Sequence, residues 1–89
     1  MNTLVIYDIP SDRLRNRVAE ACKDYGLSRI QWSAFFGDLS HNRREELEMR
    51  LRRTLGRKAA NVQLYPMCDK DVGLRVVIAT GKRGEDDDE

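Results

Sequence analysis

The sequence has 89 residues, two of them cysteine, and its 16 basic and 15 acidic side chains give a formal net charge of +1. A chain of this length forms one domain, which buries a smaller share of its surface than a large domain does and gains stability from a partner. No apolar run approaches the roughly 18 residues of a membrane helix, so we expect a cytoplasmic protein with no membrane partner. Cys22 and Cys68 fit neither a zinc motif nor a disulfide framework, so we expect both thiols to be reduced.

The first predicted strand covers residues 3–7, a continuous run of aliphatic, β-branched and aromatic side chains that is typical of a central strand. It ends at Asp8. A helix follows, for which either Ser11 or Asp12 is suited to cap the start, and Gly26 is suited to end it. Its apolar face consists of Leu14, Val18, Ala21, Cys22 and Tyr25.

Residues 29–36 alternate in a way that predicts a second strand. We expect this strand to continue to Leu39. Two sets of side chains would then lie on opposite faces: Ile30, Trp32, Ala34 and Phe36 on one, and Arg29, Gln31, Ser33 and Phe35 on the other.

A second helix is expected after this strand. Either Ser40 or Asn42 can cap its start, the latter together with Glu45, and Gly56 can end it. Its apolar stripe consists of Leu47, Leu51 and Leu55.

Two further strands complete the domain, which we expect to span residues 1–80. One covers residues 62–65 and is either ended or confined to a sheet edge by Pro66, and the other covers residues 74–80. We expect residues 81–89, a run of glycine and charge, to be a disordered acidic tail. Its last five residues are all acidic, so residues 1–84 carry 16 basic and ten acidic groups, a charge of +6 that would attract phosphates.

This order of elements predicts an α+β sandwich with both helices on one face of an antiparallel sheet. The other face has no helix to cover it. A second copy of the same sheet is the simplest cover, which predicts an isologous homodimer.

Asp8 is the first candidate for chemistry, because it follows a buried strand at a rim where a carboxylate can coordinate a hard cation. A turn-forming or helix-entry role is the alternative. One carboxylate is a poor magnesium site, but two Asp8 side chains that meet at a dimer axis could share one ion.

Basic side chains are the second group of candidates. Those on the first helix and the second strand either lie along the edge of the core or bind phosphate, and Phe35 is either a core residue or a ring on which a base stacks. Those on and after the second helix form either a solvated face or a rim that contacts duplex phosphates without reading sequence. The first set is Arg13, Arg15, Arg17 and Arg29, and the second is Arg50, Arg52, Arg53, Arg57 and Lys58.

The pattern as a whole resembles the CRISPR-associated family of the second core Cas protein, the small endonuclease-like subunit of the spacer-acquisition complex. The resemblance is dense over residues 4–39 and looser beyond. It is carried by Tyr7-Asp8-Ile9, Asp12, Arg15, Arg17, Tyr25-Gly26, Arg29-Ile30-Gln31, Ser33, Phe35, Gly37 and Leu39.

This resemblance implies a ferredoxin-like βαββαβ fold, in which the long predicted strand bends into a hairpin near Ser33 and Ala34. It also implies that the last strand, around residues 76–79, crosses to the partner's sheet. Relatives often carry a glutamate at the position of Phe36, so an additional acid is lost there.

Two functions are implied. In the first, the protein is a metal-dependent nuclease on RNA or DNA, with Mg²⁺ or Mn²⁺ held by Asp8 of both protomers. In the second, it is a non-catalytic dimeric scaffold that binds duplex DNA and bridges dimers of the CRISPR integrase, the first core Cas protein. The nuclease site would consist of Asp8, Tyr7, Arg15, Arg17, Arg29, Ser33 and Phe35.

Overall fold

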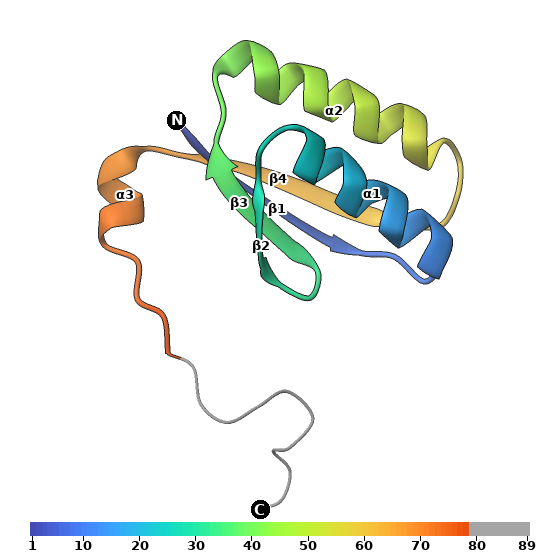
Figure 1. Cartoon of the computed structure of the whole chain (residues 1–89), viewed down its shortest axis with the longest axis horizontal. Helices are drawn as coiled ribbons and strands as arrows, with labels where there is room; N and C mark the ends of the chain where they lie inside the picture. The colour runs from blue at the N-terminus through green and yellow to red at the C-terminus, as the bar shows by residue number, and fades with distance from the viewer. Residues whose placement is uncertain (79–89) are drawn as a thin grey trace, which may run out of the picture.

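A computed structural model describes residues 1–78, which form an α+β domain (Figure 1). Its four strands make one antiparallel sheet in the order β2-β3-β1-β4. The predicted acidic tail and the end of the predicted last strand lie outside the described residues. The elements are β1 (Asn2–Asp8), α1 (Asp12–Asp24), β2 (Ser28–Gln31), β3 (Ala34–Asp38), α2 (His41–Leu55), β4 (Asn61–Met67) and the short α3 (Asp69–Gly73).

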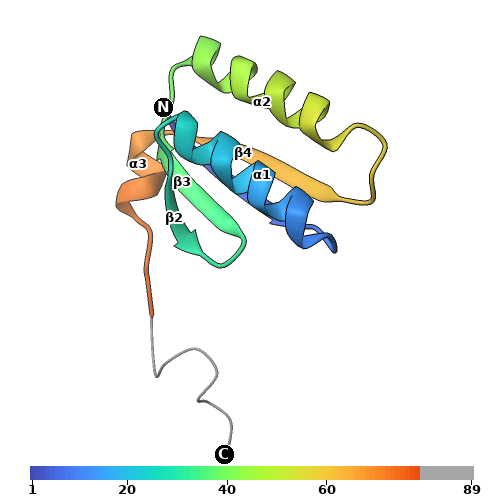
Figure 2. The same ribbon diagram turned by 45° about the vertical axis from the view of Figure 1, so that its right-hand side comes forward.

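Both long helices cover the same face of the sheet, as Figure 2 shows, so the predicted α+β layering is confirmed. The register aligns Val5 of the central strand β1 with Phe35 on β3 and Leu64 on β4. Odd-numbered residues of β1 from Thr3 to Tyr7 are buried on this side, while its even-numbered residues remain partly exposed. The opposite face, which we call the open face, presents Leu4, Ile6, Phe36 and Tyr65.

The helix ends follow from local hydrogen bonds. Ser11 Oγ accepts a hydrogen bond from the backbone N–H of Leu14 at 3.2 Å, and Ser40 Oγ accepts one from Arg43 at the same distance. The two serines, rather than Asp12 or Asn42, are therefore the caps. Gly26 and Gly56 have φ values of 83° and 54°, which few other residues adopt, and they end the helices as predicted.

The core lies between the helices and the sheet. Phe35, Leu47, Val5 and Val18 are among its largest fully buried side chains. Cys22 lies among them, and burial raises the pKa of its thiol to about 12, so it stays protonated at neutral pH. Both cysteines are free thiols, and no helix within residues 1–78 has the length and hydrophobicity to cross a membrane.

The prediction of one long strand over residues 29–39 is wrong. The segment is a hairpin, with a turn at Trp32 and Ser33 and a shift in register between Arg29 and Gln31. The alternation in the sequence runs through residues 29–36 without a break at the turn. The predicted faces are not kept, because Arg29 pairs with Phe35 and Gln31 with Ala34, which places Arg29 and Gln31 on opposite faces. The hairpin implied by the family resemblance is thus confirmed.

The predicted last strand is also not seen in the described residues. Residues 75–78 have no regular secondary structure, and the unpredicted helix α3 precedes them. A strand forms only where it hydrogen-bonds to a neighbouring strand, and this segment does not pair with either edge strand of the described sheet, β2 or β4. The apolar side chains of this segment are 71% to 85% exposed: Leu74, Val76, Val77 and Ile78.

Candidate functional site

Asp8 is exposed at the end of β1, on the open face together with Leu4 and Ile6. Its register partner on β4 is Asn61. The side chain makes no hydrogen bond or ion pair with any residue among 1–78. Its carboxylate oxygens are therefore available to a ligand from outside the chain.

A metal ion at Asp8 would need further ligands besides this one carboxylate. Within residues 1–78, no three His, Cys, Asp or Glu side chains lie close enough together to hold a metal ion. Magnesium binds through one or two carboxylates and fills its remaining positions with water or substrate phosphate. Asp8 can supply one such carboxylate.

The turn between β2 and β3 lies beside Asp8. The backbone N–H of Tyr7 donates to the carbonyl of Ser33 at 3.0 Å. Ser33 is partly buried, and this backbone bond joins the hairpin turn to the residue before Asp8. Ser33 thus lies near Asp8, and the interaction that the structure shows there is made by its backbone.

Tyr7 points into the core rather than toward the open face, with 6% of its surface exposed. Burial raises the pKa of its hydroxyl, although the positive charges of Arg29 and Arg15 act in the opposite direction. The hydroxyl has no hydrogen-bond partner within the described chain. Tyr7 therefore stays neutral at physiological pH and supports the end of β1 from behind.

Arg29 connects the aromatic residues at this end of the sheet. Its guanidinium carbon lies 4.8 Å from the centroid of the Phe35 ring and 5.8 Å from that of Trp32. Phe35 is fully buried and stacks beside Tyr7 at 6.4 Å, so the structure places its ring in the core, the first of its two expected roles.

Trp32 is the exposed ring at this site, at 57%, and sequence reasoning did not single it out. The alternation had placed it on a strand face with Ile30 and Phe36. The hairpin that the resemblance implies near Ser33 is the signal that could have identified Trp32, because a side chain in a tight turn is seldom buried in the core.

Arg15 and Arg17 differ in what they do. Arg15 donates to the carbonyl of Ile9 at 2.8 Å and pairs with Asp12, so it braces the loop between β1 and α1. Arg17 is exposed and makes no ion pair within residues 1–78. Of these two arginines, only Arg17 has its full charge available for a phosphate.

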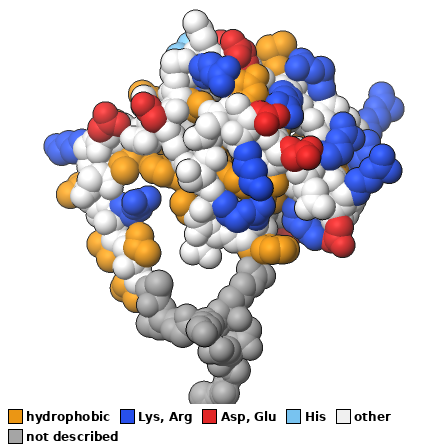
Figure 3. All heavy atoms as spheres, in the orientation of Figure 1, with side chains coloured by type: hydrophobic (Ala, Val, Ile, Leu, Met, Phe, Trp, Pro, Cys, Tyr) orange, Lys and Arg blue, Asp and Glu red, His pale blue; other side chains and the backbone are white. Residues whose placement is uncertain are grey.

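A basic hollow of about 240 Å³ lies where α1 begins and α2 has ended. Figure 3 shows Lys and Arg side chains gathered on this side of the molecule. Arg13, Arg17 and Lys58 line the hollow with Ser11 and Leu14, and none of the three cations pairs with an acid of the described chain. The fold thus joins cations that are far apart in the sequence.

The basic residues of α2 are partly neutralised. Arg50 pairs with Asp24 of α1 at 2.9 Å, and Arg52 pairs with Glu48 at 2.9 Å. Arg53 and Arg57 have no acidic partner within residues 1–78. The sequence could not distinguish the paired from the unpaired members of this group.

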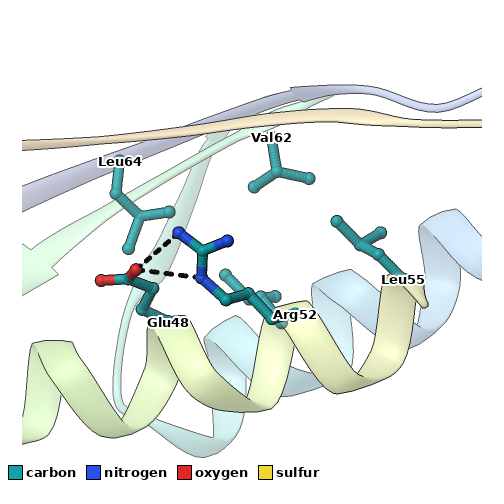
Figure 4. A pocket seen from close by; sticks show the side chains of 6 residues that line it. Glu48, Arg52, Leu55, Val62 and Leu64 are labelled. Atoms are coloured by element: carbon teal, nitrogen blue, oxygen red, sulfur yellow. Dashed lines mark hydrogen bonds and ion pairs between the residues drawn. The ribbon is translucent and has the colours of Figure 1, made fainter. Parts of the chain in front are cut away.

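A second hollow of about 320 Å³ opens between α2 and β4 (Figure 4). The Arg52–Glu48 pair lies at its side, and the hollow is otherwise lined by aliphatic side chains. It lies along the sheet edge formed by β4, and its aliphatic residues are Leu51, Leu55, Val62 and Leu64.

Comparison with known proteins places this architecture in a family. A protein of Desulforudis audaxviator named CRISPR-associated endoribonuclease Cas2 is 58% identical over 78 residues, which are 88% of this chain and 74% of the relative. A protein of Thermoproteus tenax, named as a fusion of the endonucleases Cas1 and Cas2, is 35% identical over 85% of this chain and 30% of its own length.

Solved structures agree on the fold. A crystal structure of Cas2 from Streptococcus pyogenes matches with a TM-score of 0.75, covering 89% of this chain and all of the other at 23% identity. The family described as CRISPR associated protein Cas2 matches residues 1–74, which include the whole sheet and both long helices. The chain therefore belongs to the Cas2 family of CRISPR-associated proteins.

Proposed function

We propose that the protein acts as a homodimeric endonuclease on RNA or DNA, with Mg²⁺ or Mn²⁺ bound between the Asp8 carboxylates of two protomers. The observation that carries this proposal is the exposed, unpaired Asp8 at the end of the central strand, on the open face. The relative from Desulforudis audaxviator is named an endoribonuclease, which supports an RNA substrate.

In such a site, a divalent cation neutralises phosphate charge and lowers the pKa of bound water. The chain's own residues supply position and charge. Arg17 is available to bind a neighbouring phosphate, whereas Arg15 fixes the loop that follows Asp8 through the carbonyl of Ile9. Arg29 adds positive charge beside the hairpin turn, where a developing charge on the phosphodiester would be stabilised.

The dimer is proposed from two unsatisfied features of the chain. The open face exposes apolar side chains, and β4 is an edge strand with unpaired backbone groups on its outer side. Residues 76–78 carry three exposed apolar side chains that could add a strand to the partner's β4 and extend over the α2–β4 hollow. Such an exchange would pair the free edge of β4, and packing the open faces of two protomers against each other would cover their apolar side chains.

Replacing both Val76 and Ile78 with aspartate is expected to dissociate the dimer. Each buried aliphatic side chain contributes about 1.5–3 kcal/mol, so the dimer dissociation constant should rise at least about a hundredfold. Sedimentation equilibrium measures this change. Met49→Asp, at an apolar residue of α2 that is 57% exposed, is the matched control and should leave the constant unchanged. An unaltered dimer in the double variant would disprove the exchanged strand.

A scaffold function is the second candidate. The relative from Thermoproteus tenax joins Cas1 and Cas2 in one chain, which supports a role beside an integrase in spacer acquisition. The basic hollow at the start of α1 supports binding of duplex DNA through its phosphates. In this function, Asp8 would not be needed.

The double variant Arg13→Ala, Lys58→Ala is expected to weaken duplex binding. Both cations are unpaired within the described chain, so removing each phosphate-binding charge should lower the slope of log affinity against log salt by about 0.9. Fluorescence anisotropy at several salt concentrations measures the slope. Arg52→Ala is the matched control, because Glu48 already neutralises that side chain. A slope equal to that of the wild type would show that the hollow does not bind DNA.

A further inference from the structure

We propose that the indole ring of Trp32 stacks on an unpaired base and directs a single strand of nucleic acid toward Asp8. This inference rests on the proposed function in one respect, that nucleic acid is the ligand. It assigns a positioning role to a residue outside the expected site, and it gives a physical reason for a preference for single strands.

The first support is the exposure of the ring. Trp32 is 57% exposed in the turn between β2 and β3, while the neighbouring rings of Tyr7 and Phe35 are buried at 6% and 0% exposure. More than half of the surface of Trp32 is therefore accessible to a ligand. Stacking of a base on such a ring contributes to binding whichever base it is, because every base has a flat π-face.

The second support is that Arg29 holds the turn in place. Its Nη1 atom donates to the carbonyl oxygen of Trp32 at 2.5 Å, and its guanidinium carbon lies over the ring of Trp32 at 5.8 Å and that of Phe35 at 4.8 Å. Because Phe35 is fixed in the core, this arrangement orders the turn before any ligand arrives. A pre-ordered ring loses less entropy on binding than a mobile one.

The third support is position. Ile6 pairs with Ala34, and the N–H of Tyr7 donates to the carbonyl of Ser33, so the turn is fixed to the end of β1 that carries Asp8. A base held by Trp32 would place the adjoining backbone beside the Asp8 carboxylate and the positive charge of Arg29. Bases in a duplex are already stacked on one another, and therefore only a single strand can use this interaction.

The sequence contains one tryptophan, which makes its fluorescence a specific probe of base stacking at this turn. The experiment uses the full chain carrying Asp8→Asn, without divalent metal, so that the nucleic acid stays intact. It is titrated with a short single-stranded RNA and with the same RNA in a duplex. We expect saturable quenching of the indole by the single strand and much less by the duplex.

Variants at the turn extend the test. Trp32→Ala should weaken binding of a labelled single strand roughly five- to 150-fold, as expected when one base no longer stacks on a ring, while Trp32→Phe should retain most of the affinity. Ile30→Ala is the matched control, because that side chain lies on the same hairpin and is 44% exposed. Its affinity should equal that of the parent.

Three results would overturn the inference: equal quenching by duplex and single strand, unchanged affinity in Trp32→Ala, or dissociation of the dimer by Trp32→Ala. The last would make the ring a contact between two copies. The design separates this inference from the proposed nuclease. If the wild type shows no metal-dependent cleavage but the quenching persists, the proposed nuclease is disproved and base stacking on Trp32 is supported. If cleavage occurs without quenching, the nuclease is supported and base stacking on Trp32 is disproved.

Discussion

Replacing Asp8 with asparagine is expected to abolish metal-dependent cleavage while leaving the dimer intact. The amide keeps the shape of the side chain but loses the charge that binds the cation. A catalytic divalent ion stabilises the transition state by several kcal/mol, so the rate should fall at least about a thousandfold. Cleavage of a single-stranded RNA at increasing Mg²⁺ concentration measures this loss, and sedimentation tests the dimer.

Metal binding gives a readout of Asp8 that does not depend on activity. Titration with Mn²⁺, followed by electron paramagnetic resonance, should show one ion per wild-type dimer and none in Asp8→Asn. Asp38→Asn is the control, since Asp38 is exposed at the far end of β3 and pairs with the N-terminal ammonium at 2.9 Å. Full cleavage by a well-purified Asp8→Asn protein would contradict the nuclease function and favour the scaffold.

Spacer acquisition distinguishes the two functions in the cell. If the protein serves as a scaffold, Asp8→Asn should leave acquisition intact, whereas charge reversal at the unpaired cations of the basic hollow should lower it. Arg50 and Arg52 belong, like Lys58, to the duplex-binding rim predicted from the sequence, but they are paired with Asp24 and Glu48. We therefore expect the hollow to contribute more to DNA binding than these two arginines do.

Short sequence patterns were sufficient to predict the helix ends and the end of the central strand, because these features depend on neighbouring residues. Ser11 and Ser40 cap helices through their own side chains, and Gly26 and Gly56 adopt positive φ values where the helices end. The position of Asp8 at the end of a central strand followed from the apolar run before it. Each of these features depends on residues that are close to one another in the sequence.

Features that depend on distant residues were not predictable in the same way. The basic hollow joins Arg13 and Arg17 to Lys58, which follows the next long helix, and the neutralising pair Arg50–Asp24 links α2 to α1. Periodicity could not reveal the hairpin turn at Trp32, because apolar and polar residues alternate across it in the sequence, whereas in the structure the register shifts between Arg29 and Gln31. These contacts exist only once the two helices lie together on the sheet.

Phe35→Ala is expected to be strongly destabilising, because Phe35 is the largest fully buried side chain of the core. Truncation of a buried phenylalanine costs about 3–5 kcal/mol, a large part of the roughly 5–15 kcal/mol by which a typical domain is stable. Its ring also supports Tyr7 at 6.4 Å and the guanidinium of Arg29 at 4.8 Å. Urea denaturation should therefore show a much lower midpoint.

Phe35→Leu separates packing from stacking on a substrate. Leucine fills much of the same volume without a ring, so the variant should fold with a smaller loss of stability and keep most of its cleavage activity per folded molecule. A folded Phe35→Leu protein without activity would show that the ring itself acts on the substrate. Such a result would require Phe35 to leave the core, since its side chain is fully buried against Val5 and Tyr7 in the folded chain.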